Sequence, residues 1–143
     1  MNFLLDTNVV SEWVKQKPNP RVVRWLSGIE DDRVYLSVVT FAELHHGVLR
    51  MSRGQRRDSL KSWITADLSL RFEGRILDVD PAVAEAWGLL MAESDARGVN
   101  LNVMDALIAA TSQVHDLTLV TRNLRHFAEL GIGLINPWVD GTI

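Results

Sequence analysis

An apolar run near the N-terminus, residues 3–5, stops abruptly on the carboxylate of Asp6, and this stop constrains the fold more than any other feature. The run predicts a buried first strand that carries Asp6 at its carboxyl end. In parallel α/β sheets, ligands bind at that end because the strand-to-helix turns leave a crevice there. Asp6 is also suited to cap a following helix by accepting hydrogen bonds from free backbone N–H groups. The run alone leaves both roles open.

The rest of the chain alternates between short apolar segments and segments with helical spacing. Further strands are predicted at 33–37, 75–79, 117–121 and 133–135. Helices are predicted at 9–15, 20–27, from 38 onward, around 60–68, and at 81–97, 102–115 and 124–130. Such alternation predicts an α/β fold with a parallel sheet covered by helices on both faces. With 143 residues, of which 47% are hydrophobic, the chain is expected to form a single domain over 1–143.

Composition removes several classes of function. The chain has no cysteine, which excludes disulfides, thiolate metal sites and a cysteine nucleophile and fits a reducing cytoplasm. No apolar segment approaches the roughly 20 residues that span a bilayer, so we expect a cytoplasmic protein without membrane contact. A formal net charge of −3 argues against binding nucleic acid through bulk positive charge. A local basic patch or a bound cation remains open as a means of binding it.

Two further carboxylates are expected at the same edge of the sheet as Asp6. Glu43 lies off the apolar stripe of its helix and follows Thr40 at capping-box spacing, so a capping role is one interpretation. Asp105 lies in the first turn of the 102–115 helix, where the helix dipole favours a negative charge. Each carboxylate therefore has a plain structural role. In a parallel sheet, however, both meet Asp6 and the end of the 117–121 strand in one crevice.

Three carboxylates in one crevice repel each other and raise the pKa of at least one of them unless a cation neutralises the charge. Mg²⁺ and Mn²⁺ prefer oxygen ligands and often use only a few protein carboxylates. Such an ion polarises a phosphodiester and lowers the pKa of a bound water. The pattern therefore predicts a Mg²⁺ or Mn²⁺ site held by Asp6, Glu43 and Asp105, with phosphodiester hydrolysis by a metal-activated water as the reaction.

Four phrases of the sequence together resemble a known family. The phrases at 5–9, 40–47, 102–110 and 121–127 are similar to those of PIN domains, in particular the toxin ribonucleases of VapBC and FitAB type II toxin-antitoxin pairs. The resemblance implies a three-layer α/β/α fold with a central parallel sheet of four to five strands, and an endoribonuclease that depends on Mg²⁺ or Mn²⁺. It also implies an RNA substrate, a homodimer, and a cognate antitoxin that blocks the site and binds operator DNA for the pair.

The resemblance also assigns roles to individual residues. Asp6, Glu43 and Asp105 match the three acidic positions of the family. The family often places a fourth acidic residue where this chain has Asn123, with His126 three residues further on. Asn123 is therefore expected to complete the catalytic set through its carbonyl oxygen or a water. The new RNA ends are expected to be a 5′-phosphate and a 3′-hydroxyl. Three neighbouring polar side chains are expected to orient a carboxylate or a water: Thr7, Asn8 and Thr121.

One dense group of cations, called the basic cluster below, lies outside these phrases. It consists of Arg50, Arg53, Arg56, Arg57 and Lys61. Because phosphate contacts need local positive charge whatever the net charge is, the basic cluster is a candidate RNA guide. A solvated helix face is the plainer interpretation.

Two other functions compete with the nuclease. A phosphatase with an aspartyl nucleophile would normally carry a second Asp two residues after Asp6, where this chain has Asn8. A catalytically weak PIN-like binding module that sequesters antitoxin or RNA is the second alternative, because the fourth carboxylate is missing. Trp13 is a candidate dimer contact, and the alternative interpretation places it in the core.

Overall fold

The structure is a computed structural model that describes residues 1–139. The final positions of the expected single domain, 140–143, lie outside the described residues. Within the described range, the sheet is built from β1 (Phe3–Leu5), β2 (Val34–Ser37), β3 (Ile76–Leu77), β4 (Thr118–Val120) and β5 (Leu134–Ile135). These five strands of residues 1–139 pair in parallel in the order β3-β2-β1-β4-β5. The expected parallel sheet of four to five strands is confirmed.

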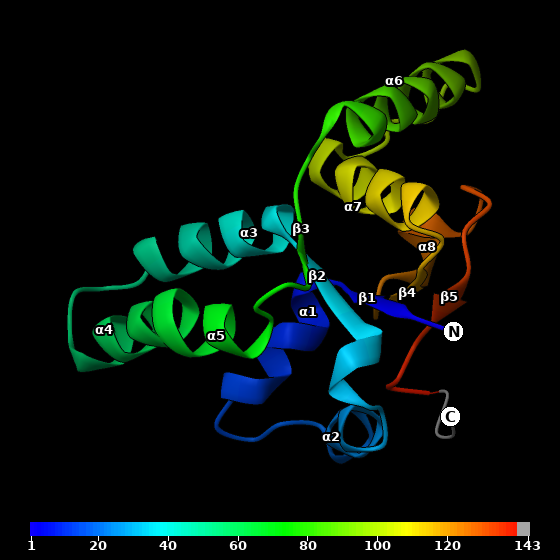
Figure 1. Cartoon of the computed structure of the whole chain (residues 1–143). Helices are drawn as coiled ribbons and strands as arrows, with labels where there is room; N and C mark the ends of the chain where they lie inside the picture. The colour runs from blue at the N-terminus through cyan, green and yellow to red at the C-terminus, as the bar shows by residue number, and fades with distance from the viewer. Residues whose placement is uncertain (140–143) are drawn as a thin grey trace.

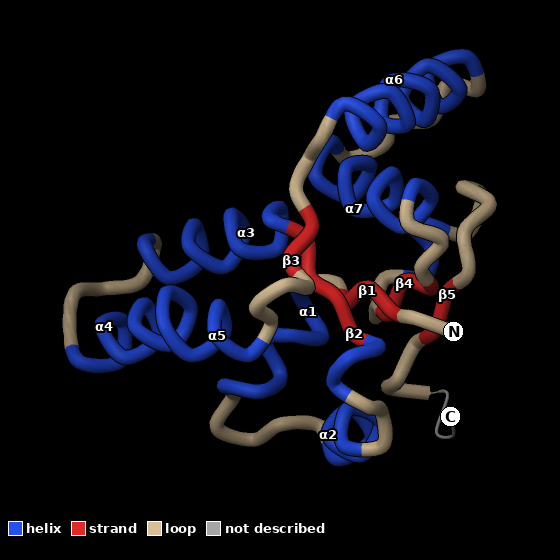
Figure 2. The backbone as a smooth tube through the Cα atoms, in the orientation of Figure 1, coloured by secondary structure: helices blue, strands red, loops and turns tan. Residues whose placement is uncertain are grey.

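Helices cover both faces of this sheet (Figures 1 and 2). The α-helices are α1 (Thr7–Val10), α2 (Pro20–Ser27), α3 (Val38–Leu49), α4 (Gln55–Ser62), α5 (Ser69–Arg71), α6 (Pro81–Ala96), α7 (Val103–Val114) and α8 (Leu124–Phe127). Two short 3₁₀ helices, η1 (Ser11–Val14) and η2 (Asp31–Arg33), and a π-helix, η3 (Trp63–Leu68), complete the set. No helix within residues 1–139 is long and apolar enough to cross a membrane.

Two hydrophobic cores lie on opposite faces of the sheet, and β1 contributes to both. Phe3 and Leu5 pack into the core under α1, α2, α3 and η3, whereas Leu4 packs into the core under α6, α7 and α8. This alternation follows from the two-residue period of a strand, and a strand covered on both faces needs apolar residues at every position. The three-layer α/β/α architecture predicted from the sequence is therefore confirmed.

The central place of β1 fixes Asp6 at the carboxyl edge of the sheet. β1 pairs with β2 on one side and with β4 on the other. The backbone N–H of Asp6 continues the ladder by donating to Val120 O at 2.9 Å. Asp6 also caps α1, because its carboxylate accepts from Thr7 N at 2.8 Å. This helix starts at Thr7, two residues before the predicted start, because the cap follows directly after the strand.

Helix α3 differs from its prediction in the residue that caps it. Ser37 is the N-cap and accepts a hydrogen bond from Val39 N at 3.0 Å. Thr40 is buried one turn inside the helix, so the capping-box interpretation of Glu43 is wrong. The strand β2 runs directly into α3, which leaves no turn in which Thr40 could act as a cap. The Glu43 side chain is therefore available for another partner.

Two apolar residues of the helices α3 and α2 lie at exposed positions. Leu49 is 53% exposed and Val23 is 38% exposed. The end of α3 extends beyond the sheet (Figure 1), so Leu49 has no core to pack against. Helical spacing identifies a face of a helix but does not show how far the covered surface extends.

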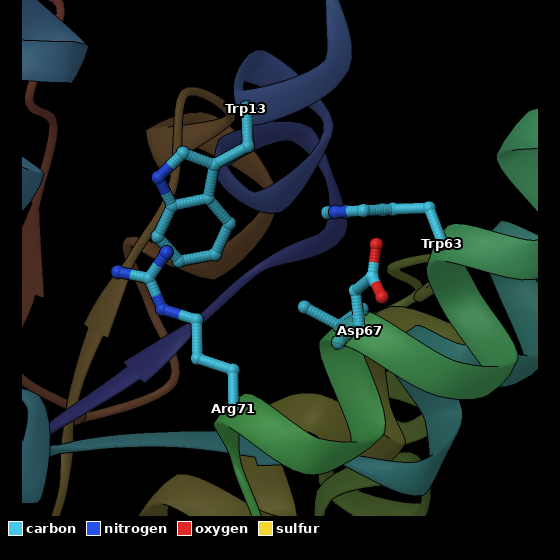
Figure 3. Close-up of a pocket in the computed structure, with 5 residues that line it drawn as sticks. Trp13, Trp63, Asp67 and Arg71 are labelled. Atoms are coloured by element: carbon cyan, nitrogen blue, oxygen red, sulfur yellow. The ribbon is translucent and has the colours of Figure 1, made fainter.

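Trp13 of η1 is partly buried and packs beside Phe72, with ring centroids 6.0 Å apart. Its ring also faces a cavity of about 260 Å³ that Trp63, Asp67 and Arg71 line from the helical segment opposite (Figure 3). The guanidinium of Arg71 lies over the Trp13 ring, 4.3 Å from its centroid. The packing agrees with the core interpretation of Trp13, and its expected role as a dimer contact stays a prediction.

Candidate active site

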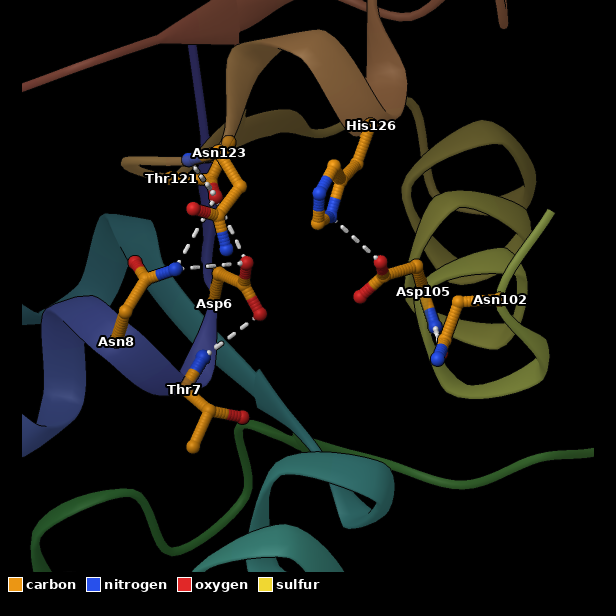
Figure 4. A network of polar contacts seen from close by, with 8 residues as sticks. All are labelled: Asp6, Thr7, Asn8, Asn102, Asp105, Thr121, Asn123 and His126. Carbon is orange, nitrogen blue, oxygen red and sulfur yellow. Dashed lines mark hydrogen bonds and ion pairs between the residues drawn. The ribbon is translucent and has the colours of Figure 1, made fainter.

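Asp6 lies at the centre of a hydrogen-bonded polar network at the carboxyl edge of the sheet (Figure 4). Its side chain is only 4% exposed. Thr121, which follows β4, donates from Oγ1 to Asp6 Oδ2 at 2.7 Å. Asn8 donates from Nδ2 to the same oxygen at 3.3 Å. The neighbouring ends of two paired strands thus supply both the carboxylate and its polar support.

The same network holds Asn8 and Asn123 beside Asp6. Asn8 Oδ1 accepts a hydrogen bond from the backbone N–H of Arg122 at 3.2 Å. The backbone N–H of Asn123 donates to Thr121 Oγ1 at 3.0 Å, and its side chain is turned toward Asp6 in Figure 4. The residues predicted to support the carboxylate are therefore brought together with Asn123 by the turn that follows β4.

Glu43 comes to the site from the second turn of α3. Thr7 Oγ1 donates to Glu43 Oε1 at 2.6 Å. Because the backbone N–H of Thr7 also donates to Asp6, Thr7 connects the two carboxylates. Glu43 is partly buried and reaches the site only because α3 follows β2 without a turn.

Asp105 lies across the opening from Asp6, in the first turn of α7 (Figure 4). Asn102 caps this helix and accepts from Asp105 N at 3.1 Å. His126 of α8 places its Nδ1 3.0 Å from Asp105 Oδ2. The sequence marks His126 only by its distance from Asn123. Its pairing with Asp105 joins two separate elements, so only the fold reveals it.

The electrostatics of the site show an excess of negative charge. Burial is the largest effect on Asp6 and raises its pKa above the ordinary value, and the charge of Asp105 raises it further. Hydrogen bonds to Asp6 act in the opposite direction without reversing the shift. Burial also raises the pKa of Glu43, with smaller increases from the charges of Asp6 and Asp105. The three carboxylates are therefore near enough to repel each other.

The site residues supply oxygen atoms of the kind that a hard divalent cation prefers as ligands. Within residues 1–139, no three Asp, Glu, His or Cys side chains already stand close enough together to enclose a metal ion. The side chains facing the opening nonetheless supply carboxylate and amide oxygens, which Mg²⁺ and Mn²⁺ prefer. A cation placed between Asp6, Glu43 and Asp105 would relieve the repulsion that adds to the raised pKa values of Asp6 and Glu43.

The basic cluster lies apart from the carboxylates. It begins at the C-cap of α3 and continues through the connecting loop into α4, which lie away from the sheet in Figure 1. Arg56 of the cluster donates from Nη2 to Val14 O at 2.8 Å, so one of its members has a structural contact. The cluster and the carboxylates are therefore separate regions of the molecule.

Comparison with known proteins identifies relatives along almost the whole chain. Residues 3–133 match the model of the PIN domain family. The chain is 38% identical to the plasmid stability protein StbB of Pseudomonas syringae pv. tomato, over 95% of this chain and 98% of that protein. It is 37% identical to the toxin FitB of Neisseria gonorrhoeae, over 96% and 99% of the two chains. It is 33% identical to the VapC ribonuclease Y4jK of Sinorhizobium fredii, over 95% and 97%.

Solved structures agree with these relatives. The crystal structure of FitAcB from Neisseria gonorrhoeae superposes with a TM-score of 0.90 at 36% identity, covering 96% of this chain and 99% of that chain. The structure of FitAB bound to an IR36 DNA fragment superposes with a TM-score of 0.88 at 35% identity, covering 95% of each chain. The chain therefore belongs to the PIN domain family and, within it, to the VapC- and FitB-like ribonuclease toxins of toxin-antitoxin pairs.

Proposed function

We propose that this protein is a Mg²⁺- or Mn²⁺-dependent endoribonuclease that acts as the toxin of a toxin-antitoxin pair. The observation that carries the proposal is the pair of carboxylates Asp6 and Glu43, which Thr7 connects through two hydrogen bonds. The pKa of each is raised, mainly by burial and also by the negative charge of Asp105. These three residues would hold the ion, and Asn123 would add a carbonyl oxygen. A bound divalent ion would polarise an RNA phosphodiester and lower the pKa of a water.

The surrounding residues keep the carboxylates in place for this chemistry. Thr121 and Asn8 both donate to Asp6 Oδ2, which fixes the plane of that carboxylate. Thr7 holds Glu43, and His126 holds one oxygen of Asp105. Such outer partners orient ligands and reduce the reorganisation that binding needs. We expect cleavage to leave a 5′-phosphate and a 3′-hydroxyl, which mapping of the RNA ends would check.

We propose in addition that the protein acts with a cognate antitoxin. Support comes from relatives solved as complexes, among them FitAB bound to DNA. As the resemblance of the sequence implies, we expect the antitoxin to bind the toxin, block its site and bring the pair to operator DNA. We also propose that the toxin is a homodimer. Size-exclusion chromatography with light scattering, on the toxin alone and with its antitoxin, tests both assemblies.

The nuclease proposal is tested by titrating Mg²⁺ or Mn²⁺ against a mixed RNA pool, with EDTA as the metal-free arm. The wild-type chain is expected to cleave only with metal. Asp6→Asn should not cleave at any metal concentration, because it removes a charged ligand and keeps the shape of the side chain. Asp32→Asn is the matched control, since Asp32 is exposed and lies in η2, before β2 and so at the opposite edge of the sheet from the site. Cleavage by Asp6→Asn at the wild-type rate would overturn the assignment.

A second candidate function is a catalytically weak module that sequesters antitoxin or RNA. Asn123 favours it, because this chain carries an amide where the family often carries a carboxylate. The same titration decides between the two functions. A wild-type chain that binds its antitoxin but shows no metal-dependent cleavage would establish the binding module and remove the nuclease.

A further inference from the structure

A small cavity beside the carboxylates is lined mainly by cationic and amide side chains. Its volume is about 200 Å³, and it lies between the turn after β4, the start of α8 and the segment after β5. Its lining residues are Arg122, Asn123, Leu124, Arg125, His126 and Asn136. Two of these also take part in the proposed active site, because Asn123 is turned toward Asp6 and His126 contacts Asp105 (Figure 4). The cavity therefore adjoins the acidic site directly.

One of its arginines is held in place by the C-terminal turn. The guanidinium carbon of Arg122 lies 5.3 Å from the centroid of the Trp138 ring. Trp138 is itself fixed, because its backbone N–H donates to Asn136 Oδ1 at 2.9 Å and its carbonyl accepts from Arg21 Nη1 at 3.3 Å. An aromatic face stabilises a cation without neutralising its charge. Arg122 is thus positioned, and within residues 1–139 it forms no ion pair with a carboxylate, while its charge also acts on Glu12.

The other arginine stands between two cavities. Arg125 is exposed, and within residues 1–139 it forms no ion pair with a carboxylate. It also lines a second cavity of about 240 Å³, to which Asp105 and His126 contribute as well. Arg125 therefore offers an uncompensated positive charge next to the proposed metal ligands.

We propose that Arg122 and Arg125 form a subsite for a phosphate of the RNA backbone that neighbours the cleaved phosphodiester. The inference rests on the proposed ribonuclease function, and it names a binding region other than the basic cluster. Successive phosphates of an RNA strand would meet alternating environments, with carboxylates and their metal at one and guanidinium groups at the next. A guanidinium matches phosphate oxygens through paired N–H donors, so arginine is suited to this role.

The test measures binding and cleavage separately. A fluorescein-labelled pool of single-stranded 12-nucleotide RNA is bound to the full-length chain in EDTA, and fluorescence anisotropy gives the affinity over a range of salt concentrations. Arg122→Gln and Arg125→Gln are examined singly and together. Arg24→Gln on α2 is the matched control, because Arg24 is exposed and lies on a helix away from α8 (Figure 1). Each variant's thermal unfolding is compared with that of the wild type.

We expect each subsite substitution to reduce the slope of log K against log salt by about 0.7, the value for one phosphate contact with a single strand. The double variant should lose about twice as much, again from counterion release, and Arg24→Gln should lose nothing. In cleavage assays, KM should rise more than kcat falls, because the lost contact is made in substrate and transition state alike.

Two results would overturn the subsite: an unchanged slope in the double variant, or an equal reduction in Arg24→Gln, which would indicate bulk charge alone. Failure of the nuclease proposal looks different. A wild-type chain that never cleaves RNA, but whose salt slope falls in the arginine variants, would retain the phosphate subsite and lose the proposed reaction. A chain that cleaves normally with unchanged slopes would retain the reaction and lose the subsite.

Discussion

Two carboxylates are buried to a similar degree in this protein, yet the charged side chains near them have opposite signs. Glu12 is 2% exposed and Asp6 is 4% exposed. Burial raises the pKa of Glu12, but its ion pair with Lys15, a hydrogen bond from Asn19 N and the charge of Arg122 outweigh burial and lower the pKa overall. Asp6 accepts hydrogen bonds, but within residues 1–139 it forms no ion pair with a cation, and its pKa is raised.

This difference in pKa shift separates a carboxylate whose charge is compensated by cations of the chain from a carboxylate that the chain leaves uncompensated. Glu12 of η1 pairs with Lys15, the residue that follows η1 as its C-cap. Its Oε1 accepts a hydrogen bond from Asn19 N at 2.8 Å, which fixes the loop before α2. Asp6 and Glu43 meet further negative charge instead. A buried carboxylate without a compensating cation is costly, which supports the proposal that a divalent ion binds here. Perturbed groups gathered in one opening are also typical of functional sites.

The largest effect expected from this contrast between Asp6 and Glu12 is on catalysis. Asp6→Asn is expected to reduce kcat/KM for metal-dependent RNA cleavage by at least about 100-fold, the lower range for losing a group that stabilises transition-state charge. Glu12→Gln should leave kcat/KM nearly unchanged, because its charge is compensated within the chain. Initial rates on one RNA at saturating Mg²⁺ provide the measurement. Equal losses in the two variants would show that burial, which the two carboxylates share, decides the loss, and that the missing cation does not.

The next effect is on stability in the presence of metal. Mg²⁺ or Mn²⁺ at about 100 times its Kd should raise the free energy of unfolding by about 2.7 kcal/mol through binding to the folded state alone. The increase should persist in Glu12→Gln and vanish in Asp6→Asn. Urea unfolding with metal and with EDTA measures it for the three chains. A metal-dependent increase that survives in Asp6→Asn would place the ion elsewhere.

Smaller effects are expected from the hydroxyl that supports Asp6. Thr121→Val removes the donor to Asp6 Oδ2 and keeps the shape of the side chain, so metal affinity should fall by about 10- to 100-fold. Thr65→Val is the control, since Thr65 is exposed and donates only to backbone carbonyls of its own helical segment. Metal titration followed by thermal unfolding gives both affinities. If Thr65→Val weakens binding as much as Thr121→Val, the orienting role of Thr121 is wrong.

The sequence predicts the site around Asp6 better than it predicts the environment of Glu12. The sequence locates Asp6, Glu43 and Asp105 through local and topological signals. These signals are an apolar strand that ends on a carboxylate, the helix starts that follow later strands, and the convergence of parallel strand ends. Glu12 has no such signal, because its environment depends on a loop that folds back to bring Asn19 N within reach. The Asp105–His126 contact and the stacking of Arg122 on Trp138 join distant parts of the chain in the same way.

The error at Thr40 has the same origin. Spacing alone allows a capping box from Thr40 to Glu43, but β2 leads into α3 one turn earlier and Ser37 takes the cap. A capping pattern is therefore reliable only when the end of the preceding strand is known. In this chain the correction matters for function, because it leaves Glu43 to accept from Thr7 at the site.

The smallest expected effect concerns pH, and its sign differs between the two carboxylates. The folded-state pKa of Glu12 lies below its ordinary value of 4.5, so its charge stabilises the fold above that pH, and the contribution is lost as the pH falls through the folded pKa. Glu12→Gln keeps an acceptor for Asn19 N but loses the charge, which should cost about 1 kcal/mol at neutral pH, the usual difference between charged and neutral hydrogen bonds. Lys15 is half exposed, which limits what the ion pair adds.

Asp6 should behave in the opposite way when metal is absent. Its folded-state pKa lies above the ordinary 3.8, so the folded chain holds the proton more tightly, and ionisation at higher pH costs stability. Asp6→Asn in EDTA should therefore be at least as stable as the wild type at neutral pH. Any gain in stability should disappear at acid pH, where Asp6 of the wild type is protonated in both the folded and the unfolded state. Urea unfolding of both variants between acid and neutral pH tests the pair. Parallel pH profiles for the two substitutions would contradict the distinction, because only a compensated carboxylate and an uncompensated one give slopes of opposite sign.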